Sequence, residues 1–396
     1  MMNLSRNEKE ALAIVRKKGI IAINDVVDSC NISIATGSRL INKLISEKFL
    51  IETVGDNIGD ILSKGRPQRY VKWHCPDRYV IGIDVGTTRI KGFLFNLNLN
   101  VIKEVDIETN PEKNARQVFN KIDNIIERLY DTNAIDKKDI MGVGLAFAGL
   151  INKNDKLIKF SPAFSWHNLD INEYLDNKTN LPLYYDNVTR LMALGESYFG
   201  YGKEYDNFIF INLGYGIGSS AVVNGELFVG ENGYAGEFGH VIAEPDSRIQ
   251  CSCGQYGCLT TISSGEYIAK RAIDLIANGE KSIICSIHPD KIDAKVVFDA
   301  ARNNDKICIS IIDNALKNLA IKIADMKKCF DPKTIIIGGG ISWNGEYFFS
   351  NLNNKLSGLN MKYDDNKKTI VMPESFPGKS ASIGAGVMVA QNILNL

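Results

Sequence analysis

The residues best suited to chemistry in this sequence are a histidine and three cysteines in its second half. They are His240, Cys251, Cys253 and Cys258. Imidazole nitrogens and thiolate sulfurs are the ligands of structural zinc sites, in which four protein ligands leave no open position for catalysis. Buried thiols are the alternative, but one histidine and three cysteines at such close spacing favour a metal. We therefore predict a structural zinc site.

A glycine-rich segment precedes this cluster. The apolar run F-I-F-I-N-L leads into Gly214, Gly216 and Gly218, and a second apolar run follows before a turn at Gly225. Glycines at alternate positions let backbone N–H groups approach an anion closely, because no side chain stands in the way. A plain glycine-rich hairpin is the alternative interpretation of these glycines taken alone.

A second turn of this kind is expected after an apolar strand at 80–83. The strand is followed by Asp84, Gly86, Thr87 and Thr88. In phosphoryl-transfer enzymes such a turn holds phosphates, while the carboxylate holds a metal-bound water. Similar turns also join ordinary hairpins, so this one does not identify a phosphate site by itself.

These segments resemble the ROK family, a bacterial group of sugar kinases and sugar-responsive repressors. Its signature is Gly-x-Gly-x-Gly, then Gly-Glu-x-Gly-His, then Cys-x-Cys-Gly-x-x-Gly-Cys, and the chain matches it at 214–218, 236–240 and 251–258. The phosphate turn departs from the family pattern, because Thr87 and Arg89 stand where the family has Gly and Lys. The resemblance runs from residue 80 to the end of the chain. It implies an actin-like ATPase fold with two α/β lobes around a cleft.

The resemblance also implies binding roles for further residues. Sugar contacts are expected from Gly149, Asn187, Glu237 and His240. Vestigial nucleotide contacts are expected from the two turns above and from a third, glycine-rich turn that ends the apolar segment 334–341. The residues are Asp84, Gly86, Thr88, Gly214, Gly216, Gly218, Gly338, Gly339 and Gly340.

Three departures from the pattern of the family's kinases bear on catalysis and sugar binding. The kinase motif Asn-Asp-Ala-Asn-Ala-Ala-Ala-Leu-Gly-Glu aligns without a gap to 187–196, which puts Val188 in place of the catalytic Asp and Arg190 in place of Asn. Valine cannot accept a proton, and a general base contributes about 100- to 10,000-fold to rate. Asp186 could replace it only after a register shift. Thr260 stands where family members carry a Glu that contacts the sugar.

The segment before this body has the pattern of three helices and two strands. Helical periodicity runs over 7–18 and again from the N-cap Ser33 to about residue 48, with a short helix between them. The runs 49–53 and 69–73 predict the strands of a hairpin. On the third helix the buried side is expected to carry Ile34, Ile41, Leu44 and Ile45.

The opposite side of the third helix is a candidate surface for reading DNA. Small and polar residues followed by Arg and Asn suit base edges and phosphates in a major groove, although a solvated helix face is the alternative. The Lys-Gly-Arg-Pro sequence in the hairpin connection resembles the wing of ROK repressors, which can lie along a minor groove. The family's kinases usually lack this head. The predicted DNA contacts are Ser33, Ala35, Thr36, Arg39, Asn42, Lys43, Gly65, Arg66 and Pro67.

Charge and cysteine content agree with this interpretation. Residues 1–78 hold 13 basic and 9 acidic side chains, whereas the whole chain holds 46 of each, so a basic head precedes an acidic body. The eight cysteines, in the absence of a signal peptide, indicate a reducing cytoplasm. No apolar run reaches the ~18–20 residues of a membrane helix, so no membrane partner is expected.

The sequence thus predicts a winged helix-turn-helix domain at 1–73, a linker at 74–79, a first α/β lobe at 80–196 completed by a helix at 380–396, and a second lobe with the zinc site at 197–379. The expected function is a sugar-responsive transcription regulator, a repressor of carbohydrate-utilisation genes. Its expected partners are double-stranded operator DNA, a sugar effector and a second copy, as a homodimer or dimer of dimers. The alternative is a working ROK sugar kinase with an appended head.

Overall fold

The structure is a computed structural model, and it divides the chain into two compact units. It describes residues 4–53, 68–109, 114–131, 135–152, 157–175, 179–359 and 369–394. One unit comprises Met1–Phe147, Asn172–Asp186 and Ser382–Leu396, and the other comprises Ala148–Ile171 and Asn187–Ala381. No helix in the described ranges is long and apolar enough to cross a membrane.

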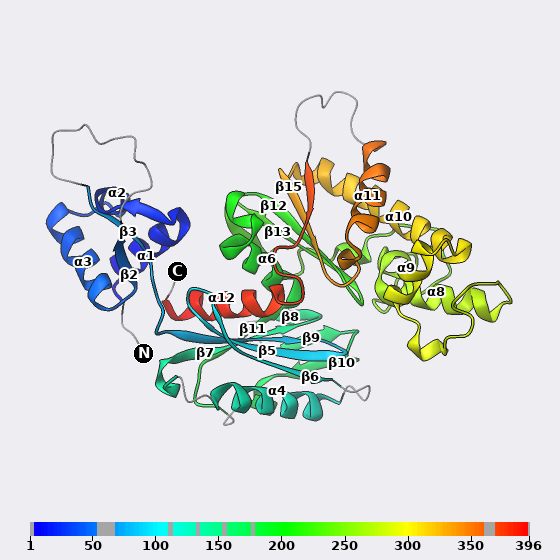
Figure 1. Cartoon of the computed structure of the whole chain (residues 1–396), viewed down its shortest axis with the longest axis horizontal. Helices are drawn as coiled ribbons and strands as arrows, with labels where there is room; N and C mark the ends of the chain where they lie inside the picture. The colour runs from blue at the N-terminus through cyan, green and yellow to red at the C-terminus, as the bar shows by residue number, and fades with distance from the viewer. Residues whose placement is uncertain are drawn as a thin grey trace. The chain divides into compact units, whose positions relative to one another are not determined.

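The N-terminal head is a winged helix-turn-helix (Figure 1). Its elements are α1 (Arg6–Lys18), β1 (Ile20–Ala22), α2 (Ile23–Ser29), α3 (Ile34–Ser46), β2 (Leu50–Thr53) and β3 (Tyr70–Trp73). The strands form an antiparallel sheet in the order β1-β3-β2, so the predicted hairpin is confirmed and β1 is an additional strand. The predicted wing residues Gly65, Arg66 and Pro67 lie outside the described residues.

Local sequence signals explain where the head's helices begin and end. Ser5 and Glu8 form a reciprocal capping box at the start of α1, and Gly19 ends that helix with a φ of 78°. Ser33 caps α3 as predicted by accepting a hydrogen bond from the Thr36 N–H at 3.2 Å. A Cβ on Gly37 would lie 2.2 Å from the Val27 side chain, so glycine allows α3 to pack closely on α2.

The predicted buried side of α3 is wrong at its first residue. Ile34 is 74% exposed, whereas the buried residues are Gly37, Leu40, Ile41 and Leu44. Ile34 is the first residue of α3, and the buried residues of that helix begin at Gly37. The core of the head therefore begins one turn later than the periodicity suggested.

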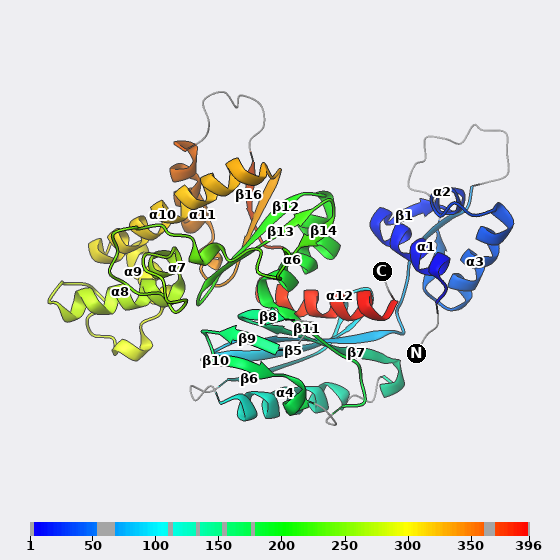
Figure 2. The ribbon, with the colours of Figure 1, turned by 180° about the vertical axis from the view of Figure 1, so that it is seen from behind.

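The first α/β lobe is a five-stranded sheet in the order β11-β7-β4-β5-β6. Its strands are β4 (Tyr79–Val85), β5 (Arg89–Asn96), β6 (Val101–Glu108), β7 (Ile140–Phe147) and β11 (Leu183–Asn187). Helix α4 (Ala115–Tyr130) covers one face, and α12 (Ser380–Leu394) covers the other (Figure 1, Figure 2). A Cβ on Gly82 or Gly144 would lie 1.9 or 2.2 Å from a carbonyl oxygen of α12, so these glycines let that helix lie directly on the sheet. Short elements η2 (Lys137–Asp139) and α5 (Asn172–Leu175) complete the lobe.

The second lobe repeats this topology. Its sheet has the order β14-β13-β12-β15-β16, from β12 (Phe208–Leu213), β13 (Ile217–Val223), β14 (Glu226–Phe228), β15 (Thr334–Gly338) and β16 (Ile370–Pro373). In each lobe the first three strands in chain order pair antiparallel with one another, and the fourth strand in chain order pairs in parallel with the first. Two lobes built on one strand order are what the actin-like ATPase fold requires, so the predicted fold class is confirmed.

Helices and a small sheet complete the second unit. The helices are α6 (Val188–Phe199), α7 (Thr260–Ser263), α8 (Gly265–Ala277), α9 (Ala294–Arg302), α10 (Lys306–Phe330) and α11 (Glu346–Ser357). The small antiparallel sheet consists of β8 (Leu150–Asn152), β9 (Leu157–Ser161) and β10 (Trp166–Asp170). The 3-10 turns are η3 (Tyr201–Glu204), η4 (Phe238–His240), η5 (Pro289–Lys291) and η6 (Ser342–Asn344).

The two compact units have different boundaries from the predicted lobes, which were 80–196 and 197–379. Helix α6 belongs to the second unit because it packs against β12 and β13 of that unit's sheet. The small sheet β8–β10 belongs there too. Pairing and packing between distant segments set these boundaries, and chain order does not reveal them.

Candidate metal centre and ligand site

The predicted metal ligands come together in one cluster. The donor atoms of His240, Cys251, Cys253 and Cys258 all lie within 4.8 Å of one another. Nδ1 of His240 is 3.5 Å from Sγ of Cys251, and Sγ of Cys253 is 3.6 Å from Sγ of Cys258. A tetrahedral zinc with bonds of about 2.0–2.3 Å separates its ligand atoms by roughly 3.5–3.8 Å. The cluster therefore has the donor set and the spacing to hold a metal ion.

A tight turn carries the three cysteines. The Cys251 N–H donates to the Gln255 carbonyl at 2.7 Å, and the Gly254 N–H donates back to the Cys251 carbonyl at 2.9 Å. Gly257 has a φ of 70°, and a Cβ there would lie 1.9 Å from the Glu244 carbonyl oxygen. Glycine is thus required at this position for the backbone to bring Cys258 back to Cys251.

A metal that binds this cluster must compete with protons for the thiol sulfurs. Cys251 and Cys258 are buried, and Cys253 is exposed. Burial and the neighbouring thiols raise the pKa of Cys258 to about 12. A metal must displace the protons of these thiols when it binds, so its affinity rises with pH.

His240 links the cluster to Glu237, a predicted sugar ligand. Its Nδ1 faces Cys251, whereas its Nε2 lies 3.8 Å from Oε2 of Glu237. Desolvation raises the pKa of Glu237, and electrostatic interaction with the nearby His240 and Arg190 side chains acts in the opposite direction. A metal-bound His240 would hold its ring in one orientation and so position this carboxyl group.

Asn187 and Gly149, the other predicted sugar ligands, bond to each other. Nδ2 of Asn187 donates to the Gly149 carbonyl at 2.8 Å. Oδ1 of Asn187 accepts from the N–H groups of Thr189 and Arg190 at 2.8 and 3.2 Å, which makes it the N-cap of α6. Asn187 therefore positions the start of α6, which carries Val188 and Arg190.

Arg190 is 6% exposed and lies in the first turn of α6. Its Nη1 donates to the Gly233 carbonyl at 2.8 Å. Gly233 belongs to the loop that leads to Glu237. Sequence comparison marked Arg190 as a departure from the kinase motif, but no local pattern indicated its burial or this contact.

The predicted nucleotide glycines fall into two groups. A Cβ would meet no atom within 4 Å at Gly216 or Gly340, and at Gly214 it would meet only Oδ1 of Asn212, at 3.7 Å, so these positions have room beside the backbone. By contrast, a Cβ would approach a neighbouring atom to 2.4–2.6 Å at Gly86, Gly218, Gly338 and Gly339, so internal packing explains those glycines. Asp84, Gly86 and Thr88 belong to the first unit and the other nucleotide residues to the second.

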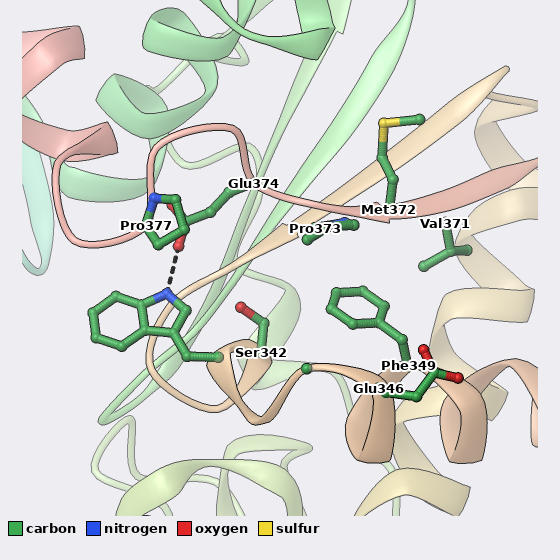
Figure 3. Close-up of a pocket in the computed structure, with 10 residues that line it drawn as sticks. Ser342, Glu346, Phe349, Val371, Met372, Pro373, Glu374 and Pro377 are labelled. Carbon is green, nitrogen blue, oxygen red and sulfur yellow. Dashed lines mark hydrogen bonds between the residues drawn. The ribbon is translucent and has the colours of Figure 1, made fainter.

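A cavity of about 430 Å³ lies beside the glycine turn of the second unit and was not predicted (Figure 3). Trp343 and Phe349 line it, together with Glu374. Glu374 is buried and accepts hydrogen bonds from Nε1 of Trp343 at 2.8 Å and from the Gly339 N–H at 3.1 Å. Its carboxylate thus holds the glycine turn in place, and no sequence motif marks it.

The predicted DNA-reading residues of the head form one exposed helix surface. Ala35, Thr36, Arg39, Asn42 and Lys43 are all exposed on α3. Three of them already make side-chain contacts. Nζ of Lys43 bonds to Oε1 of Glu8 at 2.7 Å, Oδ1 of Asn42 accepts from Arg69 at 3.3 Å, and the Thr36 hydroxyl bonds to the Ser33 hydroxyl at 2.9 Å. Arg39 makes no such contact within the described ranges, which leaves its guanidinium available.

Comparison with known proteins agrees with this architecture. The sequence profile of the ROK family matches residues 80–392. A glucokinase of Halalkalibacterium halodurans is 32% identical over 68% of this chain and 82% of its own length. A xylose repressor of Bacillus spizizenii is 26% identical over 98% of this chain and 96% of its own length.

A solved structure extends the match to the whole fold. A ROK family transcriptional regulator, described as a homologue of the E. coli MLC protein, superposes with a TM-score of 0.79 at 23% identity, covering 98% of this chain and 96% of its own. With the matching profile, the two lobes of one topology and the His/Cys cluster, this chain belongs to the ROK family.

Proposed function

We propose that the protein is a sugar-responsive transcription regulator, a repressor of carbohydrate-utilisation genes. The observation that carries this proposal is the exposed surface of α3 with its available Arg39, presented by a head joined to a ROK body. The xylose repressor of Bacillus spizizenii aligns over the head as well as the body, which supports the same role.

The body is proposed to act as a sensor rather than as a kinase. Val188 stands where the alignment of 187–196 with the kinase motif requires the catalytic Asp, and its side chain cannot take a proton. The open glycines Gly214, Gly216 and Gly340 are remnants of a nucleotide site in this proposal. The similarity to a glucokinase is the reason to test turnover directly.

The ligands proposed for the body follow from its site residues. Glu237 and His240 bind sugar hydroxyls, and Asn187 and Gly149 hold the adjoining start of α6 in place. The metal in the cluster is zinc, because three thiolates and one imidazole match its preferences. A homodimer or dimer of dimers is proposed because two recognition helices must enter major grooves about 34 Å apart on one duplex.

Replacing Arg39 with alanine is expected to weaken DNA binding about 5- to 150-fold, since a base or phosphate contact of this kind contributes about 1–3 kcal/mol. The probe is a duplex selected by the wild-type protein from a random library. Gel-shift titration at several salt concentrations provides the measurement, and loss of a phosphate contact also lowers the salt dependence.

The matched control for this experiment is Arg128→Ala. Arg128 is an exposed arginine in the last turn of α4 in the body. It should bind the selected duplex as the wild type does. Equal affinity of Arg39→Ala and wild type would show that α3 is not the DNA-reading surface.

Replacing Glu237 with alanine is expected to abolish the effect of sugar on DNA affinity without changing DNA affinity in the absence of sugar. Coupling between two such sites typically amounts to 1–3 kcal/mol, or about 5- to 150-fold in affinity. Sugars that raise the melting temperature of the wild type are added to the gel-shift titration. The control is Glu226→Ala, an exposed carboxylate on β14. A normal sugar response in Glu237→Ala would exclude this site as the sensor.

A further inference from the structure

Arg190 is a buried cation whose charge the proposed function does not yet use. Removing a guanidinium from water is unfavourable unless other groups compensate for its lost hydration. The contact of Nη1 with the Gly233 carbonyl provides one such interaction. A planar guanidinium in this position can also bind a carboxylate or a phosphate with two parallel hydrogen bonds.

Three differences from the kinase motif, at positions 188, 190 and 260, each make the charge of the site more positive. Relative to the kinase motif, Val188 and Thr260 are neutral residues where carboxylates are expected, and Arg190 is a cation where a neutral amide is expected. All three residues lie in the same unit as Glu237 and His240. A site for a neutral sugar needs none of these changes, whereas carboxylates at 188 and 260 would repel an anionic one.

The hydroxyl of Thr260 provides a second, independent indication. Thr260 is 7% exposed, and its Oγ1 is buried with no hydrogen-bond partner among the described residues. This oxygen lies beside Gly239, because a Cβ added to Gly239 would be only 2.4 Å from it. Gly239 stands between Glu237 and His240 in the sequence. An unsatisfied buried hydroxyl destabilises the protein by about 1–3 kcal/mol, which a ligand that accepts its hydrogen would relieve.

We propose that the effector is an anionic sugar, whose carboxylate or phosphate is bound by Arg190 while Glu237 binds a sugar hydroxyl. This inference rests on the proposed function, because it specifies the ligand of the same sensor site. The first turn of α6 adds a favourable field for the anion, since the N-terminal end of a helix carries partial positive charge. Sugar acids and phosphorylated sugars share this chemistry, and the experiment separates them.

The experiment measures the affinities of glucose, glucuronate and glucose 6-phosphate, and of galactose, galacturonate and galactose 6-phosphate, by calorimetry on the full chain. Wild type is expected to bind at least one charged sugar about 10- to 100-fold more tightly than its neutral parent, as charge-assisted hydrogen bonds allow. Whether the uronate or the 6-phosphate binds more tightly shows whether the effector is a sugar acid or a sugar phosphate. Inorganic phosphate alone should bind weakly, because it lacks the hydroxyls that Glu237 recognises.

Three variants test the role of Arg190. Arg190→Gln should remove the preference for the charged sugar, and Arg190→Lys should keep part of it. Val188→Asp should weaken binding of the charged sugar relative to its neutral parent, because the added carboxylate repels an anion. This variant supplies a test that does not depend on the folding of Arg190→Gln. Melting temperature and metal content show that each variant is folded.

The outcomes separate this inference from the proposed function. Equal or tighter binding of the neutral parents, no binding by any charged sugar, or an unchanged preference in a folded Arg190→Gln would each overturn the inference. If a neutral sugar alone changes DNA affinity, then the regulator proposal stands and the anionic effector is wrong. If a charged sugar binds through Arg190 but leaves DNA affinity unchanged, then the inference stands and the sensor role of the body is wrong.

Discussion

Removing the metal is expected to lower the melting temperature of this protein by about 10–20 °C. Structural zinc contributes several kcal/mol or more to the folded state, and in a lobe of this size each kcal/mol shifts the melting temperature by about 2–4 °C. Without the ion, the donor atoms of three thiols and an imidazole remain within 4.8 Å of one another with no metal to hold them together. The loop from Cys251 to Cys258 then loses the contact that holds it beside His240 and Glu237.

Elemental analysis and thermal unfolding together measure this effect. Protein purified without chelators should carry one zinc per chain, and a strong chelator or Cys258→Ser should remove it. Cys329→Ser is the matched control, because Cys329 is an exposed thiol outside the cluster. The control should keep its zinc and its melting temperature. A metal-free wild type, or a Cys258→Ser variant with full zinc and unchanged stability, would refute the structural zinc site.

The protein is expected to phosphorylate no sugar above the background rate. A general base contributes about 100- to 10,000-fold to such a rate, and Val188 contributes no base. Coupled ATPase assays over hexoses, pentoses and amino sugars provide the measurement, with an active ROK glucokinase assayed in parallel. All sugars should give only the background rate of ATP hydrolysis.

Asp186→Asn decides what any observed turnover would mean. Asp186 is buried and lies in β11, immediately before the start of α6. Turnover that disappears in a folded Asp186→Asn variant would identify Asp186 as a replacement base and make the protein a kinase. Turnover that survives in this variant would point to a base elsewhere and would equally refute the sensor proposal.

Short-range patterns in the sequence were sufficient for several elements. One histidine and three cysteines that lie close together in the sequence predicted their own cluster, because the turn that joins the three cysteines is short and rich in glycine. The capping signal of Ser33 likewise predicted the start of α3. Each of these signals depends on residues close together in the sequence, so it can be recognised without knowledge of the rest of the fold.

Other features depend on contacts between residues far apart in the chain. Lys43 bonds to Glu8, and Ile34 is exposed, because of how α1, α2 and α3 pack together. The contact of Arg190 with Gly233 likewise depends on a loop that follows it by some forty residues. Sequence alone identified an unusual arginine in a kinase-like motif. Only the tertiary structure showed that it is buried beside the loop of Glu237, because burial and charge environment are set by every segment that packs around a side chain.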